Sequence, residues 1–137
     1  MITRELLIGD FEDALRLWNE VEGIEICEGD SRAEIGQYLE RNPGLSRVAE
    51  EDGAIAGVVL CGHDGRRGLI YHLAVRPTWQ GKGVGKLLIN DCICGLQAAG
   101  IKRAIILVAG DNATGREFWL RNGWEDIADA IPMGKDI

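Results

Sequence analysis

The sequence predicts an α/β fold of the α+β kind, formed as one domain over residues 1–137. Apolar runs typical of strands occur between segments with the apolar spacing of helices, along the whole chain. A glycine-rich turn at residues 80–86 joins one such strand to one such helix. With 137 residues, of which 46% are hydrophobic and 27% charged, the chain has the size and composition of one globular domain.

The first third of the chain predicts a strand followed by two helices. Residues 2–8 form a short apolar run that favours a strand. Asp10 is a suitable N-cap for a helix over residues 10–21, where apolar side chains recur every three or four positions. Asp30 and Ser31 can cap a second helix, which ends before an Asn-Pro-Gly sequence because proline and glycine do not continue it.

Three strands are predicted next. Residues 45–50 and 54–61 are separated by Asp52-Gly53, a pair typical of tight hairpins. Residues 58–60 (Val-Val-Leu) are apolar on both faces, so the second of these strands is expected in the middle of a sheet. Residues 69–75 form the third strand, which ends just before a proline.

The last part of the chain predicts two helices and up to three strands. A helix over residues 84–99 is followed by glycine in the position expected of a left-handed cap. Residues 103–109 are apolar enough for a buried strand, and the Asp-Asn pair at 111–112 can cap a short helix. Residues 124–127 and 130–133 are predicted as two closing strands.

The glycine-rich turn is the feature that points to a ligand. Gly81, Gly83 and Gly85 occupy every second position, and glycine lets backbone N–H groups approach a ligand closely. The helix that follows presents unpaired N–H donors and the positive end of its dipole, which favours phosphate. Residues 65–90 carry five basic and no acidic side chains, although the whole chain has a net charge of −7. A phosphate-bearing ligand is therefore expected at this turn.

Two common glycine motifs do not fit. A Walker A loop would need glycine at Gln80 and Ser or Thr at Leu87. A dinucleotide motif would need glycine at Lys86 or at Leu88, depending on where it starts. A nucleotide-binding protein of another fold is therefore disfavoured.

The turn does match Q-x-x-G-x-G, formed by Gln80, Gly83 and Gly85. With the Leu-Ala-Val strand before it and the helix after it, residues 73–86 resemble the coenzyme A signature of the GNAT superfamily of N-acetyltransferases. Residues 112–124 are similar to a second motif block of these enzymes, and the narrower likeness is to small bacterial YpeA-type members. The resemblance covers nearly the whole chain. It implies the GNAT acyl-CoA N-acyltransferase fold, with a central mixed twisted sheet of six to seven strands flanked by about four helices.

The resemblance implies an N-acetyltransferase that uses acetyl-CoA as co-substrate, without a metal. The acetyl group would pass from the thioester to a primary amine by direct attack in a ternary complex. Backbone groups at residues 73–75 would bind the pantetheine arm and the acetyl carbonyl, and N–H groups at 80–86 would hold the diphosphate. The implied coenzyme contacts are Leu73, Ala74, Val75, Gln80, Gly81, Lys82, Gly83, Val84, Gly85, Lys86, Asn112 and Trp119.

The catalytic groups are not assigned by the resemblance. Many family members place a tyrosine acid where this chain has Trp119, and an indole N–H does not release a proton usefully. Trp119 is therefore expected to pack against the coenzyme or the core. Tyr71, His72 and Glu28 are the candidates for a base. Tyr71 and His72 are neighbours on one strand, so alternation predicts that only one of them faces the cleft.

Charge and composition limit the partners. Residues 1–64 contain 15 acidic and 5 basic side chains, and Glu25, Glu28 and Asp30 lie where GNAT enzymes shape the acceptor site. A cationic amine, on a small molecule or a peptide, is therefore the expected acceptor. The net negative charge disfavours nucleic acid. No apolar run reaches the ~20 residues of a membrane helix and no signal-peptide pattern is present, so a cytoplasmic protein is predicted.

Two further possibilities stay open at this point. Because Trp119 replaces the usual acid, the chain could instead be a catalytically silent acyl-CoA-binding or regulatory module of the same fold. Exposed edge strands near the C-terminus could pair two subunits into a homodimer.

Overall fold

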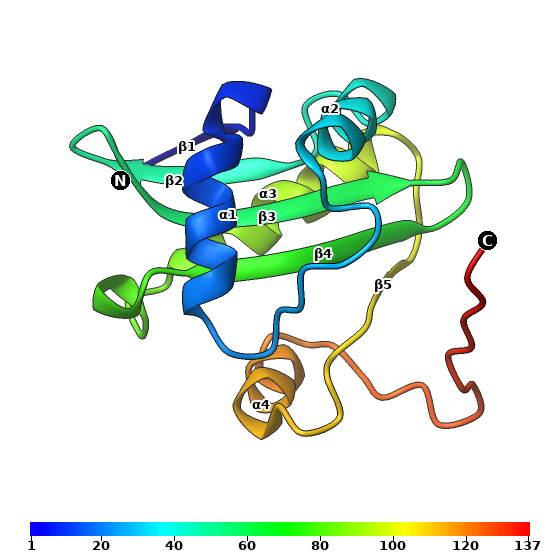
Figure 1. The fold of residues 1–137 in the computed structure, drawn as a ribbon. Coiled ribbons are helices and arrows are strands. Elements are labelled where there is room, and N and C mark those ends of the chain that lie inside the picture. The colour runs from blue at the N-terminus through cyan, green and yellow to red at the C-terminus, as the bar shows by residue number, and fades with distance from the viewer.

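The computed structural model describes the chain from Met1 to Ile137 and contains a five-stranded mixed sheet with helices on both faces (Figure 1). The strand order is β1-β2-β3-β4-β5, with antiparallel pairs except for the parallel pair β4–β5. The elements are β1 (Ile2–Glu5), η1 (Ile8–Asp10), α1 (Phe11–Glu20), α2 (Arg32–Arg41), β2 (Arg47–Glu51), β3 (Ala54–His63), β4 (Gly68–Val75), η2 (Pro77–Trp79), α3 (Val84–Ala98), β5 (Ala104–Ile106) and α4 (Ala113–Arg121).

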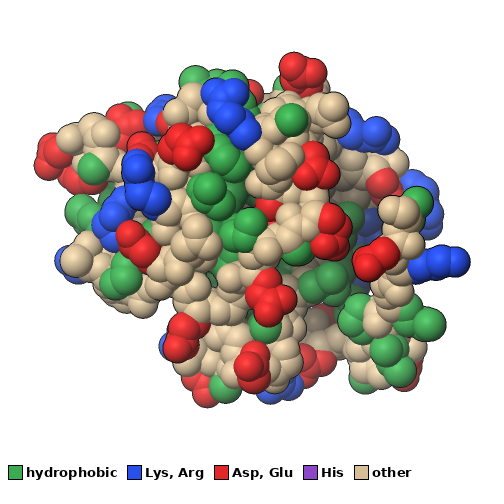
Figure 2. All heavy atoms as spheres, viewed as in Figure 1, with side chains coloured by type: hydrophobic (Ala, Val, Ile, Leu, Met, Phe, Trp, Pro, Cys, Tyr) green, Lys and Arg blue, Asp and Glu red, His purple; other side chains and the backbone are tan.

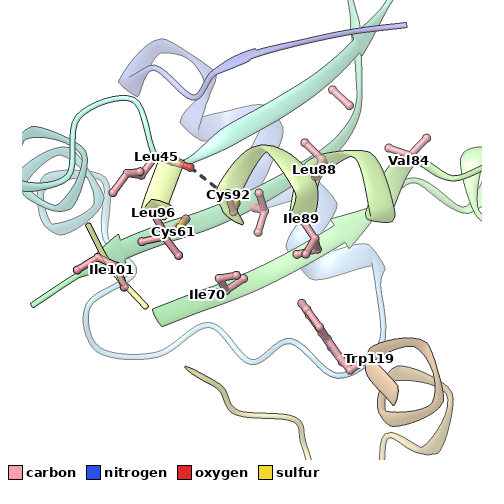
Figure 3. Close-up of a cluster of buried hydrophobic side chains, with 12 residues drawn as sticks. Leu45, Cys61, Ile70, Val84, Leu88, Ile89, Cys92, Leu96, Ile101 and Trp119 are labelled. Atoms are coloured by element: carbon pink, nitrogen blue, oxygen red, sulfur yellow. Dashed lines mark hydrogen bonds between the residues drawn. The ribbon is translucent and has the colours of Figure 1, made fainter. Parts of the chain in front are cut away.

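Two apolar layers hold the sheet between the helices. On one face, α1 and α2 cover β2 to β4, and Leu17 and Trp18 of α1 are buried against Val58 of β3. On the other face, α3 packs against the sheet, with Leu88 and Cys92 among the side chains that contact the core (Figure 3). β3 is buried on both faces and lies in the middle of the strand order. The prediction of a central strand is therefore confirmed.

The helix caps follow local sequence in two of three cases. Ser31 caps α2 by accepting a hydrogen bond from the Glu34 N–H at 3.1 Å, as predicted. Asn112 caps α4 by accepting from the Gly115 N–H at 3.0 Å, also as predicted. Asp10 was predicted to cap α1, and this is wrong. Its side chain caps no N–H group of α1.

The Asp10 carboxylate is used elsewhere. It accepts two hydrogen bonds from the Arg4 guanidinium, at 2.8 and 2.9 Å, and one from the Leu7 N–H at 2.9 Å. The Arg4 guanidinium lowers the pKa of the Asp10 carboxyl below its usual value. Asp10 also ends the short helix η1 and has helical backbone angles, whereas a capping residue needs an extended conformation.

The strand count is lower than predicted. The first strand ends at Glu5 instead of residue 8, because the chain turns into η1. Residues 124–127 and 130–133 do not form the predicted closing strands, so the sheet has five strands instead of six or seven. Ile131 and Met133 are exposed and Pro132 cannot donate to a ladder, so this segment lacks the burial and the donors of a strand. The C-terminal edge strands expected to pair two subunits are therefore absent, and β1 and β5 are the two edges of the sheet.

No helix in the structure combines the length and the apolar character needed to cross a membrane. The four cysteines are all free thiols, with Cys61 and Cys92 buried and Cys27 and Cys94 exposed. No three or more His, Cys, Asp or Glu side chains come together in an arrangement that could hold a metal ion.

The packing of α3 predicts a contrast between two neighbouring leucines. Leu88 is fully buried against the sheet, whereas Leu87 is 38% exposed. We expect Leu88→Ala to lower the free energy of unfolding by about 2–5 kcal/mol because it leaves a cavity. Leu87→Ala, the matched control, should change it by less than about 1 kcal/mol. Urea denaturation measures both, and equal losses would contradict the assigned packing face.

Candidate functional site

The site lies where β4 and β5 separate. The two strands pair only over Gly68–Ile70 and Ala104–Ile106, and β4 then continues to Val75 with no strand on its outer side. The Arg76 N–H donates to the Ala56 carbonyl of β3 at 2.8 Å. Because backbone groups alternate along a strand, the N–H of Val75 points away from β3, toward this open side. The end of β4 thus offers backbone groups to a ligand.

The turn after β4 carries a row of free donors. Gly81 and Gly83 have φ angles of 75° and 84°, which glycine adopts without strain. None of the six amide N–H groups from Gly81 to Lys86 donates a hydrogen bond within the chain, and Leu87 is the first to donate, to the Gly83 carbonyl. Six consecutive free donors at the start of a 15-residue helix form a setting that favours an anion.

Gln80 differs from the other residues of the turn. Its N–H donates to the Pro77 carbonyl at 3.3 Å, so the row of free amides begins one residue later than the sequence predicts. Its side-chain amide donates to the Val75 carbonyl at 3.0 Å. The Gln80 side chain therefore links the turn to the end of β4 by a hydrogen bond.

Close packing fixes the turn in place. A Cβ at Gly85 would lie 3.1 Å from the Phe118 ring of α4, and a Cβ at Gly57 would lie 3.0 Å from side chains of Val84 and Leu88. Glycine at these two positions lets α3 approach both α4 and β3. Lys82 places its Nζ 5.1 Å from the centre of the Trp79 ring, a cation–π contact within the turn.

A bulge in β4 changes the predicted alternation of Tyr71 and His72. Val58 pairs with Ala74 but Leu60 pairs with Tyr71, so β4 contains one extra residue between these pairs. His72 takes up this residue with a φ of 52°. Tyr71 packs in the α1–α2 layer and the His72 ring lies 5.2 Å from the Trp18 ring of α1. The bulge therefore breaks the strict alternation on which the prediction that only one of the two faces the cleft relied.

The segment between α1 and α2 is bound to the bulge through Asp30. The His72 Nε2 and the Asp30 Oδ2 are 2.9 Å apart, and Asp30 is only 8% exposed. Asp30 also accepts from the Cys27 N–H at 3.2 Å, and the Trp18 Nε1 donates to the His72 carbonyl at 2.9 Å. The sequence carries no signal for the Asp30–His72 contact, because it joins residues 42 positions apart.

The other base candidates have different surroundings. Burial raises the pKa of the Tyr71 hydroxyl, so this group stays protonated at neutral pH. Glu28 and Glu25 are both exposed on the α1–α2 segment. Figure 2 shows several acidic side chains on the face where this segment crosses the sheet.

Asn112 and Trp119 belong to the α4 side of the site. A groove of about 1230 Å³ lies between α3, β5 and α4, and its lining includes Lys86, Asn112 and Trp119. The Asn112 side chain also lies against Gly23 of the α1–α2 segment. Trp119 is 8% exposed and stacks edge-on against Trp124, with ring centres 4.9 Å apart. Figure 3 shows its ring directed from α4 toward the core beside α3.

A comparison with family models matches residues 10–124 to the acetyltransferase (GNAT) family. The chain belongs to this family. The expected fold and enzyme class are thereby confirmed, and the chain is a GNAT N-acetyltransferase. The narrower likeness to YpeA-type members stays a prediction.

Solved structures share the fold of this acetyltransferase at low sequence identity. The aminoglycoside 6'-N-acetyltransferase AAC(6')-IG from Acinetobacter haemolyticus is 18% identical, with a TM-score of 0.79 over 100% of this chain and 99% of that one. Glucosamine-6-phosphate N-acetyltransferase from Arabidopsis thaliana is 18% identical, with a TM-score of 0.70 over 98% and 97%. AAC(6')-Iy, solved with the bisubstrate analogue CoA-S-monomethyl-acetylneamine, is 17% identical, with a TM-score of 0.78 over 99% and 98%.

The geometry of the turn predicts the effect of adding one methyl group. Gly83 has a positive φ and open space around its Cα, so Gly83→Ala adds backbone strain without a clash. We expect it to lower the free energy of unfolding by about 1–2 kcal/mol. Gly110→Ala is the matched control, because Gly110 also has open space but no positive φ. Chemical denaturation compares them, and an equal response of the two variants would contradict the left-handed turn.

Proposed function

We propose that this acetyltransferase moves the acetyl group of acetyl-CoA to a primary amine by direct attack in a ternary complex. The observation that carries the proposal is the row of six free amides at residues 81–86, placed beside the open side of β4. A coenzyme with a diphosphate and a long thioester arm has the chemistry to occupy both features at once.

The chain's own residues would divide the binding of acetyl-CoA between them. The amides of residues 81–86 would hold the diphosphate, and Lys82 and Lys86 would add positive charge. The backbone of residues 73–75 would run beside the pantetheine arm, and Asn112 would contact it from the α4 side. The N–H of Val75, which points to the open side, would donate to the acetyl carbonyl oxygen and stabilise the charge that develops there.

The reaction would then need few further groups. Holding the amine and the thioester in contact supplies much of the rate. After the amine nitrogen bonds to the carbonyl carbon, the C–S bond breaks and coenzyme A leaves as a thiolate. Because the Trp119 indole is a poor acid, the thiolate would take up the proton that the acylated nitrogen releases. The site therefore does not require a tyrosine at position 119.

A positively charged acceptor is the class that the surface favours. The α1–α2 segment carries exposed Glu22, Glu25 and Glu28. It crosses the sheet at β4 (Figure 1) and contacts the bulge through the Asp30–His72 pair. Carboxylates around the entrance attract an ammonium group. We therefore propose an amine on a small molecule or a peptide that carries positive charge, in a protein without nucleic-acid or membrane partners.

The test is a screen for free thiol released from acetyl-CoA with a panel of amines that includes polyamines, amino acids, aminoglycosides and peptides. We expect thiol release with at least one cationic amine and stabilisation of the folded protein by acetyl-CoA. A protein that binds acetyl-CoA but releases no thiol with any amine would be the silent module instead. Stabilisation by ATP or NAD but not by acetyl-CoA would overturn the proposal.

A charge reversal tests the binding site separately from turnover. We expect Lys82→Glu with Lys86→Glu to weaken acetyl-CoA binding by about tenfold or more, since two cations beside the diphosphate become anions. Arg66→Glu with Arg67→Glu is the matched control, because these two residues lie in the turn at the other end of β4. Isothermal titration calorimetry measures both, and equal weakening would argue for a long-range charge effect instead of a local site.

A further inference from the structure

We propose that His72 is the base that takes a proton from the acceptor ammonium, and that Asp30 is the residue that positions its ring. This assignment rests on the function proposed above, because it requires an amine acceptor. It follows from three features of the bulge: the backbone conformation, the use of the two ring nitrogens and the position of His72 directly before residues 73–75.

The backbone of His72 is held in an unfavourable conformation. His72 and Asp52 are the only non-glycine residues with positive φ, and Asp52 lies in the β2–β3 hairpin turn where such angles are common. A left-handed residue within a strand costs about 1–2 kcal/mol, so it persists only where its surroundings fix it. Here the Trp18 indole binds the His72 carbonyl and Asp30 binds its ring. The histidine is thus fixed at both its backbone and its side chain.

The two ring nitrogens of His72 have different roles. An ionised carboxylate only accepts hydrogen bonds, so Nε2, which lies 2.9 Å from Asp30, carries the ring proton. In the neutral ring, Nδ1 then has a free lone pair. Nδ1 has no hydrogen-bond partner in the chain and is not among the buried atoms that lack one, so solvent reaches it. The ring therefore presents a proton acceptor outside the Asp30 contact.

The place of His72 suits this role better than that of the other candidates. His72 lies two residues beyond the last β4–β5 pair and directly before residues 73–75, beside which the thioester is proposed to lie. It is also in contact with the α1–α2 segment, where the acceptor is proposed to enter. Burial raises the pKa of the Tyr71 hydroxyl, so this group keeps its proton at neutral pH, and Glu28 is exposed on the α1–α2 segment.

The proton steps balance without a further acid. The ammonium gives one proton to Nδ1, which leaves a neutral amine and an imidazolium stabilised by the Asp30 carboxylate. The amine lone pair forms the C–N bond, and the C–S bond breaks with its electron pair on sulfur. The departing thiolate takes the second proton from the acylated nitrogen, and the imidazolium returns its proton to solvent. The products are the amide, the free thiol of coenzyme A and one proton.

The test compares two nucleophiles of the same shape. One is an alkylamine that the screen finds active, and the other is its O-alkylhydroxylamine, which is uncharged at pH 7 and needs no deprotonation before attack. His72→Asn is the variant, because asparagine tolerates a left-handed backbone. We expect kcat/KM to fall about a hundredfold for the alkylamine and far less for the hydroxylamine. His63→Asn, the control at the chain's other histidine, should leave kcat/KM unchanged for both nucleophiles.

The ratio of the two rates is measured on one protein sample, so a partly unfolded variant does not alter it. Equal losses for both nucleophiles, or no loss for either, would overturn the assignment of His72. We expect Asp30→Asn to lower kcat/KM more for the alkylamine than for the hydroxylamine, but by a smaller factor than His72→Asn does. We also expect NMR of this variant to show that His72 no longer keeps its proton on Nε2. A wild-type protein that acetylates neither nucleophile nor any other amine would refute the proposed function itself.

Discussion

The close approach of α3 to the sheet is the contact on which the site depends. Gly57 of β3 leaves no room for a side chain between itself and Val84 and Leu88, so the first turns of α3 lie directly on the strand. Gly85 allows the same close contact with Phe118 of α4. Because α3 is fixed by these contacts, its free N-terminal amides hold a constant position next to the end of β4. A side chain larger than glycine at position 57 would move the helix and with it the donors.

Three departures from regular structure meet in this region, and together they create the cleft. β4 loses its partner after Ile70, it contains an extra residue at His72, and the turn after it leaves six amides unpaired. Each departure alone would weaken the fold, since unpaired backbone groups and left-handed residues both cost free energy. The two apolar layers on either side of β3 offset these costs. We propose that the three features serve together as parts of one acetyl-transfer site in this GNAT family member.

The sequence could predict features that depend on neighbouring residues. The glycine turn, the Ser31 and Asn112 caps and the central position of β3 all follow from local spacing and apolar pattern. The contact of Asp30 with His72 could not be predicted, because it depends on a mismatch in register between β3 and β4. The cap assigned to Asp10 is wrong because its carboxylate binds the Arg4 guanidinium of β1 and the Leu7 N–H instead. The two closing strands were predicted in part from Ile127, Ile131 and Met133, which the structure leaves exposed.

Amide hydrogen exchange is the measurement that tests the central claim most directly. The N–H groups of residues 81–86 have no acceptor in the chain, so they should exchange rapidly in the free protein. Saturation with acetyl-CoA should slow the exchange of these amides strongly, while the amides of the distant β3–β4 turn should exchange as before. Rapid exchange at residues 81–86 in the presence of bound acetyl-CoA would show that the coenzyme binds elsewhere and would contradict the account.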